Sequence, residues 1–168
     1  LTLPLLSIAS FRFGDGELES PSPEKMMTDS DVGVSDVSVG GDHVCAILSN
    51  ETVYCWGQNS WEYGDGSNDS SSTPTSISIP PAWQVDYYYG EMSIGIPDGG
   101  GANGHACMSG QIGNDGSGQS LDLVCWGNNS HGQLGDGSNT DRNNSIQILA
   151  SGVSQIAAGN GHSLILKA

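Results

Sequence analysis

The sequence has few basic residues and no long apolar run. Only 4 Lys and Arg stand against 19 Asp and Glu, which gives a formal net charge of −15. An acidic surface repels nucleic-acid phosphates and anionic lipid headgroups, so we expect no nucleic-acid partner. No stretch reaches the roughly 18 consecutive apolar residues of a membrane-spanning helix, so we expect no membrane span.

Phenylalanine and helical periodicity are also scarce. The chain has 2 Phe against 25 Gly, and no stretch shows a convincing helical apolar period, so we expect little helix. So polar a chain could be disordered. Its apolar residues, however, gather in short β-type runs, such as residues 44–48 and 53–56, joined by the polar connection 49–52. These runs and the many glycine turns predict an all-β fold.

The sequence repeats itself. An apolar alternation followed by a glycine turn and a histidine occurs three times, as VSDVSVGGDHVCAIL at 34–48, GGGANGHACMSG at 99–110 and VSQIAAGNGHSLILK at 153–167. His43, His105 and His162 hold the same place in each copy, which favours a structural role for them. A second pattern follows, as VYCWGQNSWEYGDG at 53–66 and VCWGNNSHGQLGDG at 124–137.

The Gly-Asp-Gly turns that end this second pattern lie at unequal spacing. They occur at residues 14–16, 64–66 and 135–137, so the first interval is 50 residues and the second is 71. We assign the longer interval to extra, glycine-rich loop residues around 91–104 and 109–120.

Together these motifs resemble the regulator-of-chromosome-condensation repeat family. That resemblance implies four-stranded antiparallel blades arranged as a β-propeller. It predicts about three propeller-type blades here, the last completed by the N-terminal strand of its own chain or of a neighbouring subunit. The family includes the nucleotide exchange factor for the small GTPase Ran, but only blade-building residues match, so we carry no activity over.

The resemblance also implies how the cysteines pair. Four cysteines permit three pairings. In a blade of this family the His-x-Cys strand lies beside the Cys-Trp-Gly strand, which implies disulfides between Cys45 and Cys55 and between Cys107 and Cys125.

The third copy lacks its cysteine. Leu164 stands in the cysteine position, and aligning residues 14–16 with 64–66 places Leu5 against Cys55. We therefore divide the chain into an N-terminal strand segment (1–16) that completes a blade and is possibly donated to a neighbour, a tether or loop (17–33), and a blade-repeat domain (34–168). A half-blade left alone exposes an apolar edge that invites strand addition. The residues expected to mediate self-assembly are Leu1, Leu3, Leu5, Leu6, Ile8, Leu164 and Leu166.

Four sequons and an even number of cysteines favour a secreted, extracellular glycoprotein. The acceptor asparagines are Asn50, Asn68, Asn128 and Asn143. Residues 1–9 resemble part of a signal-peptide apolar region without its basic segment, so the chain is either already processed or a fragment.

These features of the sequence lead to two hypotheses about function. The leading hypothesis is a secreted structural protein that assembles head-to-tail into a fibre or layer by donating its N-terminal strand. The alternative is an extracellular propeller-type binding module, or a fragment of a longer propeller, that recognises a protein or glycan partner.

We expect no enzyme, no cofactor and no metal site, although N-linked glycans are expected. No catalytic triad or carboxylate pair can be read from the spacing. Asp65, Ser67 and Asp69 resemble the start of a calcium loop, but the glutamate of an EF-hand is replaced by Ser76.

Overall fold

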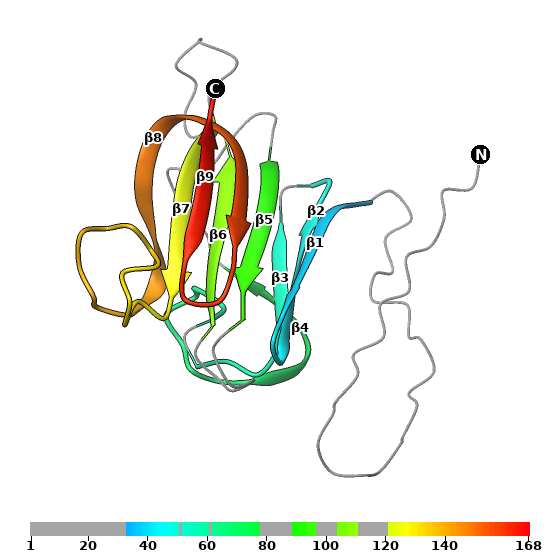
Figure 1. Cartoon of the computed structure of the whole chain (residues 1–168). Coiled ribbons are helices and arrows are strands. Elements are labelled where there is room, and N and C mark those ends of the chain that lie inside the picture. The colour runs from blue at the N-terminus through cyan, green and yellow to red at the C-terminus, as the bar shows by residue number, and fades with distance from the viewer. Residues whose placement is uncertain (1–32, 51, 61, 78–88, 97–103, 111–120) are drawn as a thin grey trace.

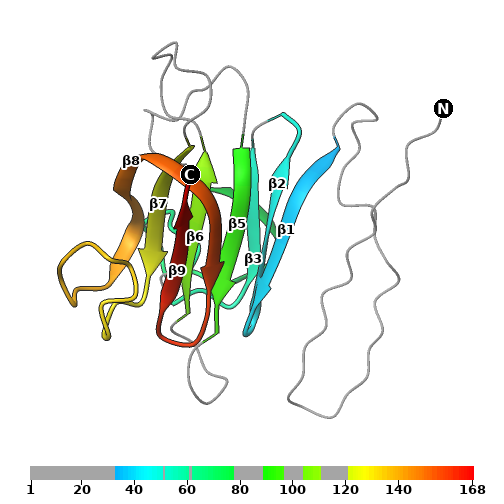
Figure 2. The same cartoon turned by 45° about the horizontal axis from the view of Figure 1, so that its top comes forward.

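The computed structural model describes residues 33–50, 52–60, 62–77, 89–96, 104–110 and 121–168. All regular secondary structure in this part of the chain is β-strand, as the sequence predicts. The strands form two antiparallel sheets that lie side by side, with β1 and β8 at opposite sides of the molecule (Figures 1 and 2).

The first sheet is a four-stranded blade. Its strands are β1 (Val34–Gly40), β2 (His43–Leu48), β3 (Val53–Gly57) and β4 (Ser71–Ile77), and they pair in this order. Each strand alternates side chains between the two faces of the sheet. Gly41 has a φ of 51°, a left-handed conformation that glycine adopts without strain, and it begins the tight turn from β1 to β2.

The second sheet has five strands in the order of the chain. They are β5 (Tyr89–Gly95), β6 (His105–Gly110), β7 (Leu121–Gly127), β8 (Arg142–Ala158) and β9 (Ser163–Lys167). The position of β5 corrects one prediction from the sequence, which assigns residues from Glu91 onward to an extra loop. Met92 and Ile94 alternate as buried residues that face the first blade, and this packing makes the segment a strand.

The long strand β8 belongs to two blades. Its residues 142–149 pair with β7 and close the second blade, Val153 pairs with both β7 and β9, and the residues that follow up to 158 pair with β9. Gly152, with a φ of 83°, lies between the two parts. We call residues 153–158 together with β9 the half blade, because they match the first two strands of each complete blade. The expected completion of this blade by residues 1–16 lies outside the described residues.

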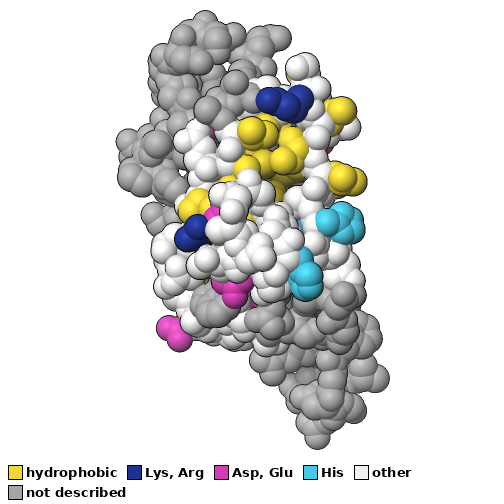
Figure 3. Space-filling model, turned by 60° about the vertical axis from the view of Figure 1, so that its left-hand side comes forward, with side chains coloured by type: hydrophobic (Ala, Val, Ile, Leu, Met, Phe, Trp, Pro, Cys, Tyr) yellow, Lys and Arg dark blue, Asp and Glu magenta, His cyan; other side chains and the backbone are white. Residues whose placement is uncertain are grey.

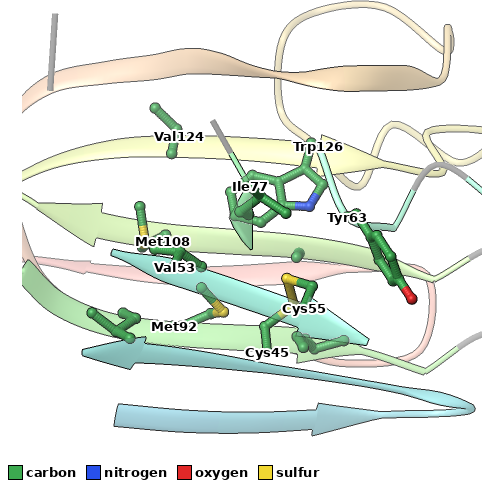
Figure 4. Close-up of a cluster of buried hydrophobic side chains, with 12 residues drawn as sticks. Cys45, Val53, Cys55, Tyr63, Ile77, Met92, Met108, Val124 and Trp126 are labelled. Atoms are coloured by element: carbon green, nitrogen blue, oxygen red, sulfur yellow. A yellow bond between two sulfur atoms is a disulfide. The ribbon is translucent and has the colours of Figure 1, made fainter. Parts of the chain in front are cut away.

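The main core lies between the first and second blades (Figure 4). The first blade contributes the Cys45–Cys55 disulfide and Tyr63, and the second contributes Met108 and Trp126. A second apolar cluster around Leu123, Leu134 and Val153 lies between the second blade and the half blade. Face-to-face packing therefore holds successive blades together.

Hydrogen bonds between blades repeat in register with this packing. The backbone N–H groups of Met92 and Ile94 donate to Asp36 Oδ2 (2.7 Å) and Ser38 Oγ (3.1 Å) of the first blade. Ala158 N–H of the half blade donates in the same way to Ser93 Oγ (2.8 Å). The equivalent bonds show that the half blade stacks on the second blade as the second stacks on the first.

Candidate functional site: the open edge of the half blade

Two disulfides cross adjacent strands. The structure joins Cys45 to Cys55 and Cys107 to Cys125, the pairs that the resemblance implies. In each case the cysteines are direct partners across the second and third strands of a blade. The half blade carries Leu164 in the corresponding position of β9.

The predicted glycosylation sites differ in their surroundings. Asn50, Asn68 and Asn143 are exposed. Asn128 is half-buried, and its Oδ1 accepts hydrogen bonds from Ser130 Oγ (2.8 Å) and Gln133 Nε2 (2.6 Å). Glycosylation stays a prediction at all four positions. Of the predicted self-assembly residues, those before residue 10 lie outside the described residues, and Leu164 and Leu166 lie on β9.

The three equivalent histidines have different partners. His105 Nε2 lies 2.9 Å from Ser163 Oγ of the half blade, and that hydroxyl donates to the Gln133 carbonyl oxygen (2.9 Å). Burial lowers the pKa of His105 to about 4. His43 is equally buried, so its pKa is also lowered, but its Nε2 has no hydrogen-bond partner. His162 is exposed, and its Nδ1 lies 2.8 Å from the Asn160 carbonyl oxygen.

A buried asparagine organises the loop that follows the third strand of each complete blade. Asn129 Oδ1 accepts from Leu134 N–H (3.0 Å), and its Nδ2 donates to Asp136 Oδ1 and to the Ser138 carbonyl oxygen (both 3.0 Å). Asn59 binds the loop of the first blade in the same way. This role of the asparagines was not predicted from the sequence, although the repeated Trp-Gly-x-Asn spacing indicates it.

The carboxylate of Asp136 is neutralised within its own loop. Arg142 Nη2 lies 2.7 Å from Asp136 Oδ2, and Ser138 donates to the same carboxylate. These donors, Arg142 first, hold the pKa of Asp136 well below its usual range. Within the described ranges, no group of three or more His, Cys, Asp and Glu side chains is placed to hold a metal ion.

The strand β9 offers an open edge. Among the described residues it pairs only with β8. Gly159 N–H donates to the His162 carbonyl oxygen (2.9 Å), so by antiparallel alternation Leu164 bonds to β8, whereas the backbone groups of Ser163 and Ile165 point to the open side. Leu164 and Leu166 are 65% and 56% exposed. This edge combines free backbone groups with apolar side chains.

Two hollows flank the open edge. One, of about 350 Å³, is lined by Glu91, Gln155, Ile156, Ala157, Leu164 and Leu166. The other, of about 200 Å³, lies between β9 and the loop that Asn129 organises, and its lining includes Gln133, Leu134 and Gly135. Figure 3 shows hydrophobic side chains gathered on the side of the molecule where β8 lies, with histidines beside them. We refer to the second hollow as the socket.

The geometry of this edge suits docking better than catalysis. Its lining side chains are apolar or neutral, apart from Glu91 and the exposed histidines His131 and His162. An extended segment that pairs with an exposed strand gains backbone hydrogen bonds, and side-chain pockets select its sequence. As to membranes, the part of the chain that the structure describes has no helix that could cross a bilayer.

Two family models match the chain, and both describe the regulator of chromosome condensation (RCC1) repeat. One matches residues 34–64, which contain most of the first blade, and the other matches residues 123–166, from β7 into β9. Each model thus falls on a part of the chain that contains the repeated sequence motifs.

Curated relatives support the same assignment. The human X-linked retinitis pigmentosa GTPase regulator is 28% identical over 163 residues, which cover 94% of this chain and 14% of that protein. The ultraviolet-B receptor UVR8 of Arabidopsis thaliana is 28% identical over 134 residues, which cover 79% of this chain and 26% of that protein. The chain therefore spans about a quarter or less of the length of these relatives.

Solved structures share the fold. The crystal structure of human WBSCR16 matches with a TM-score of 0.58 and 22% identity, over 80% of this chain and 31% of that one. The structure of Prp20p from Saccharomyces cerevisiae, described with its binding to Gsp1p and histones, matches with a TM-score of 0.56 and 20% identity, over 81% of this chain and 29% of that one. The two repeat matches and the blades together show that the chain contains repeats of the RCC1 type.

Proposed function

We propose that this chain is a non-catalytic binding module of the β-propeller type, which binds an extended segment of a protein along β9. The observation that carries the proposal is the open edge. Its backbone groups at Ser163 and Ile165 face away from β8, and Leu164 and Leu166 expose apolar surface beside them. An exposed strand of this kind pairs readily with another chain.

A protein partner fits the surface better than a nucleic acid. The chain carries a formal charge of −15, which repels phosphate backbones. Prp20p, whose fold is similar, is described as binding two protein partners, Gsp1p and histones. A protein with the same fold therefore binds proteins, although those particular partners are not transferred to this chain.

We also propose that the protein is located in an oxidising, extracellular compartment. The disulfides between Cys45 and Cys55 and between Cys107 and Cys125 are compatible with it, because such bonds persist outside the reducing cytosol. The exposed sequons at Asn50, Asn68 and Asn143 fit a glycoprotein of that compartment. Mass spectrometry of native material before and after deglycosylation tests this part.

A second candidate is head-to-tail self-assembly, in which residues 1–16 of one copy occupy the β9 edge of the next. The exposed apolar surface at Leu164 and Leu166 favours self-assembly, because exposed apolar patches mark sites of contact between proteins. A contact of this kind that does not close into a ring produces a filament.

Light scattering after size-exclusion chromatography separates the two candidates. Self-assembly predicts a mass that rises with concentration and returns to that of a monomer in a variant lacking residues 1–10 or carrying Leu164→Lys and Leu166→Lys. Val39, which is 63% exposed on β1, supplies the matched control Val39→Lys. If the 168-residue chain stays monomeric at all concentrations, self-assembly is refuted.

A further inference from the structure

The outer strand of the first blade carries a run of hydroxyl side chains. Residues 70–76 read SSSTPTS, so every residue of this run except Pro74 is a serine or a threonine. Most of the run lies on β4, the last strand of the first sheet. The exposed members on this strand are Ser72, Thr73, Thr75 and Ser76. Binding along β9 does not use this surface.

Thr73 and Pro74 lie in a bulge of β4. Three residues of this strand, at 72–74, stand opposite the single residue Trp56 of β3, and the ladder resumes at Thr75. A bulge leaves its extra residues without partners in the ladder and bends the strand locally. The Thr73–Pro74 pair is therefore presented outside the regular pairing of the sheet.

The side chain of Ser71 holds the backbone of the bulge. Ser71 Oγ donates to the Thr73 carbonyl oxygen (2.6 Å) and accepts from Thr73 N–H (3.2 Å). Pro74 has no N–H, and its ring keeps the preceding residue extended. Thr73 Oγ1 lies 3.4 Å from Ser71 Oγ, at the long end of hydrogen-bonding distances. The bulge thus presents a weakly bound hydroxyl on an extended, ordered backbone.

The second blade has a bulge in the same place. Residues 143–145 of β8 stand there opposite Trp126. Asn143 Nδ2 donates to the carbonyl oxygen of Gly66 in the preceding blade (3.1 Å), and yet Asn143 and Asn144 are exposed. A bulge at this position therefore stays accessible even where a preceding blade contacts it. The exposure of the first bulge follows from its place on the outer strand of a blade.

Both bulges carry an acceptor pattern for a sugar. The second bulge, at 143–145, reads Asn-Asn-Ser, which is one of the predicted sites of N-linked glycosylation. The first bulge, at 72–74, reads Ser-Thr-Pro within a run of serine and threonine, and such runs with proline are typical of O-linked glycosylation. The equivalent places in the two blades thus offer a nitrogen and an oxygen acceptor.

We propose that Thr73 is a site of O-linked glycosylation. This inference rests on the extracellular location in the proposed function, because a secreted chain meets the enzymes that transfer sugars. In the reaction, Thr73 Oγ1 attacks the anomeric carbon of a nucleotide-activated sugar. The bond between that carbon and the phosphate oxygen breaks, the nucleotide leaves with the bonding electrons, and the hydroxyl proton passes to a basic group of the transferase.

A sugar at this position would protect the outer edge of the blade. In the described part of the chain, β4 pairs with β3 alone. Edge strands commonly carry a proline or a bulge, which hinders pairing with another chain. Pro74 and the bulge already interrupt this edge, and a hydrophilic sugar on Thr73 would cover it further.

Peptide mapping by mass spectrometry tests the site. The 168-residue chain is secreted from cultured eukaryotic cells, treated with an enzyme that removes N-linked sugars, and mapped by electron-transfer fragmentation. We expect the added mass of a hexose or an N-acetylhexosamine on Thr73. Thr140 is the internal control, because it is exposed but lies in a loop and is not followed by proline. It should carry no sugar.

Three variants separate the acceptor, the proline and the bulge. Thr73→Ala should lose the sugar at this position. Pro74→Ala keeps the acceptor and should lower the modified fraction about two- to fivefold, because it restores the conformational freedom that a proline removes. The double change Asn144→Thr with Ser145→Pro places the same pair in the second bulge and should produce a new O-linked sugar at position 144. Thermal unfolding shows whether each variant is folded.

The failure of this inference can be distinguished from that of the extracellular location. N-linked sugars on the sequons together with an unmodified Thr73 would overturn the O-linked site and leave the location intact. A chain without sugars of either kind would refute both. A phosphate on Thr73, equal modification of Thr73 and Thr140, full modification of Pro74→Ala, or an unmodified position 144 in the double variant would overturn the role of the bulge and its proline.

Discussion

Serine in place of Ala106 should stabilise the protein by giving His43 a hydrogen-bond partner. His43 and His105 hold equivalent places in the two complete blades. His105 Nε2 lies 2.9 Å from Ser163 Oγ, whereas His43 Nε2 is buried without a partner in the described part of the chain. The residue after the next blade's histidine is Ser163 in one case and Ala106 in the other, and this difference accounts for the unpaired nitrogen.

The expected magnitude follows from this comparison. A buried polar group without a partner costs about 1–3 kcal/mol, and a new hydrogen bond contributes about 1 kcal/mol net. Ala106 is fully buried, so the added oxygen also costs some packing. We expect Ala106→Ser to stabilise the fold by about 1 kcal/mol. The reverse change, Ser163→Ala, removes a partner from His105 and from Gln133, and should cost about 1–3 kcal/mol.

Urea unfolding at pH 7.5 with the disulfides intact measures both changes by linear extrapolation. Ala46→Ser is the matched control. Ala46 is a buried alanine of β2, and the hydroxyl of a serine at this position would have no designated partner. If Ala106→Ser destabilises the chain as much as Ala46→Ser does, His43 Nε2 is either satisfied or out of reach, and the reasoning is refuted.

Three further predictions concern pH, the ion pair and the disulfides. Burial lowers the pKa of His105 to about 4, so between about pH 6.5 and pH 4 the unfolded chain binds more protons than the folded chain. The free energy of unfolding should therefore fall as the pH falls through this window, by at most about 3 kcal/mol from this group. This dependence on pH should be weaker in His105→Gln. The pKa of Asp136 is lowered chiefly by Arg142, so stability should be lost as pH falls below about 4, and a urea titration of Asp136→Asn should lack this loss. Replacing Cys45 and Cys55 together by alanine should cost about 3 kcal/mol, as should replacing Cys107 and Cys125, and equal stability of parent and variant under non-reducing conditions would contradict the structural role of that bond.

The repeat could be predicted from the sequence because each blade is built from local patterns. Apolar alternation and polar connections predict the hairpin of β2 and β3, and the structure forms it. The buried positions of Trp56 and Trp126 follow from the same pattern. The strand β5 could not be predicted in this way, because its glycines and its acidic residue are typical of a loop. It is a strand because Met92 and Ile94 pack on the first blade.

The candidate site was only partly predictable. The apolar edge at Leu164 and Leu166 follows from the position of the third repeat, and both residues lie exposed on β9. The socket could not be predicted, because it forms between a loop of one blade and a strand of the next. Gln133 and Ser163 are distant in sequence, and nothing in their local sequence shows that their atoms meet.

Local sequence was enough to specify most strands, the turns and the repeat, because alternation and glycine chemistry act over a few residues. Tertiary packing was needed to establish which faces of the blades meet, and therefore which groups are paired and which stay open. Stacking of successive blades buries Trp126 against Gly64, leaves His43 Nε2 without a partner, and leaves the equivalent position at Gly135 open. These differences arise between blades, since equivalent local sequences meet different neighbours.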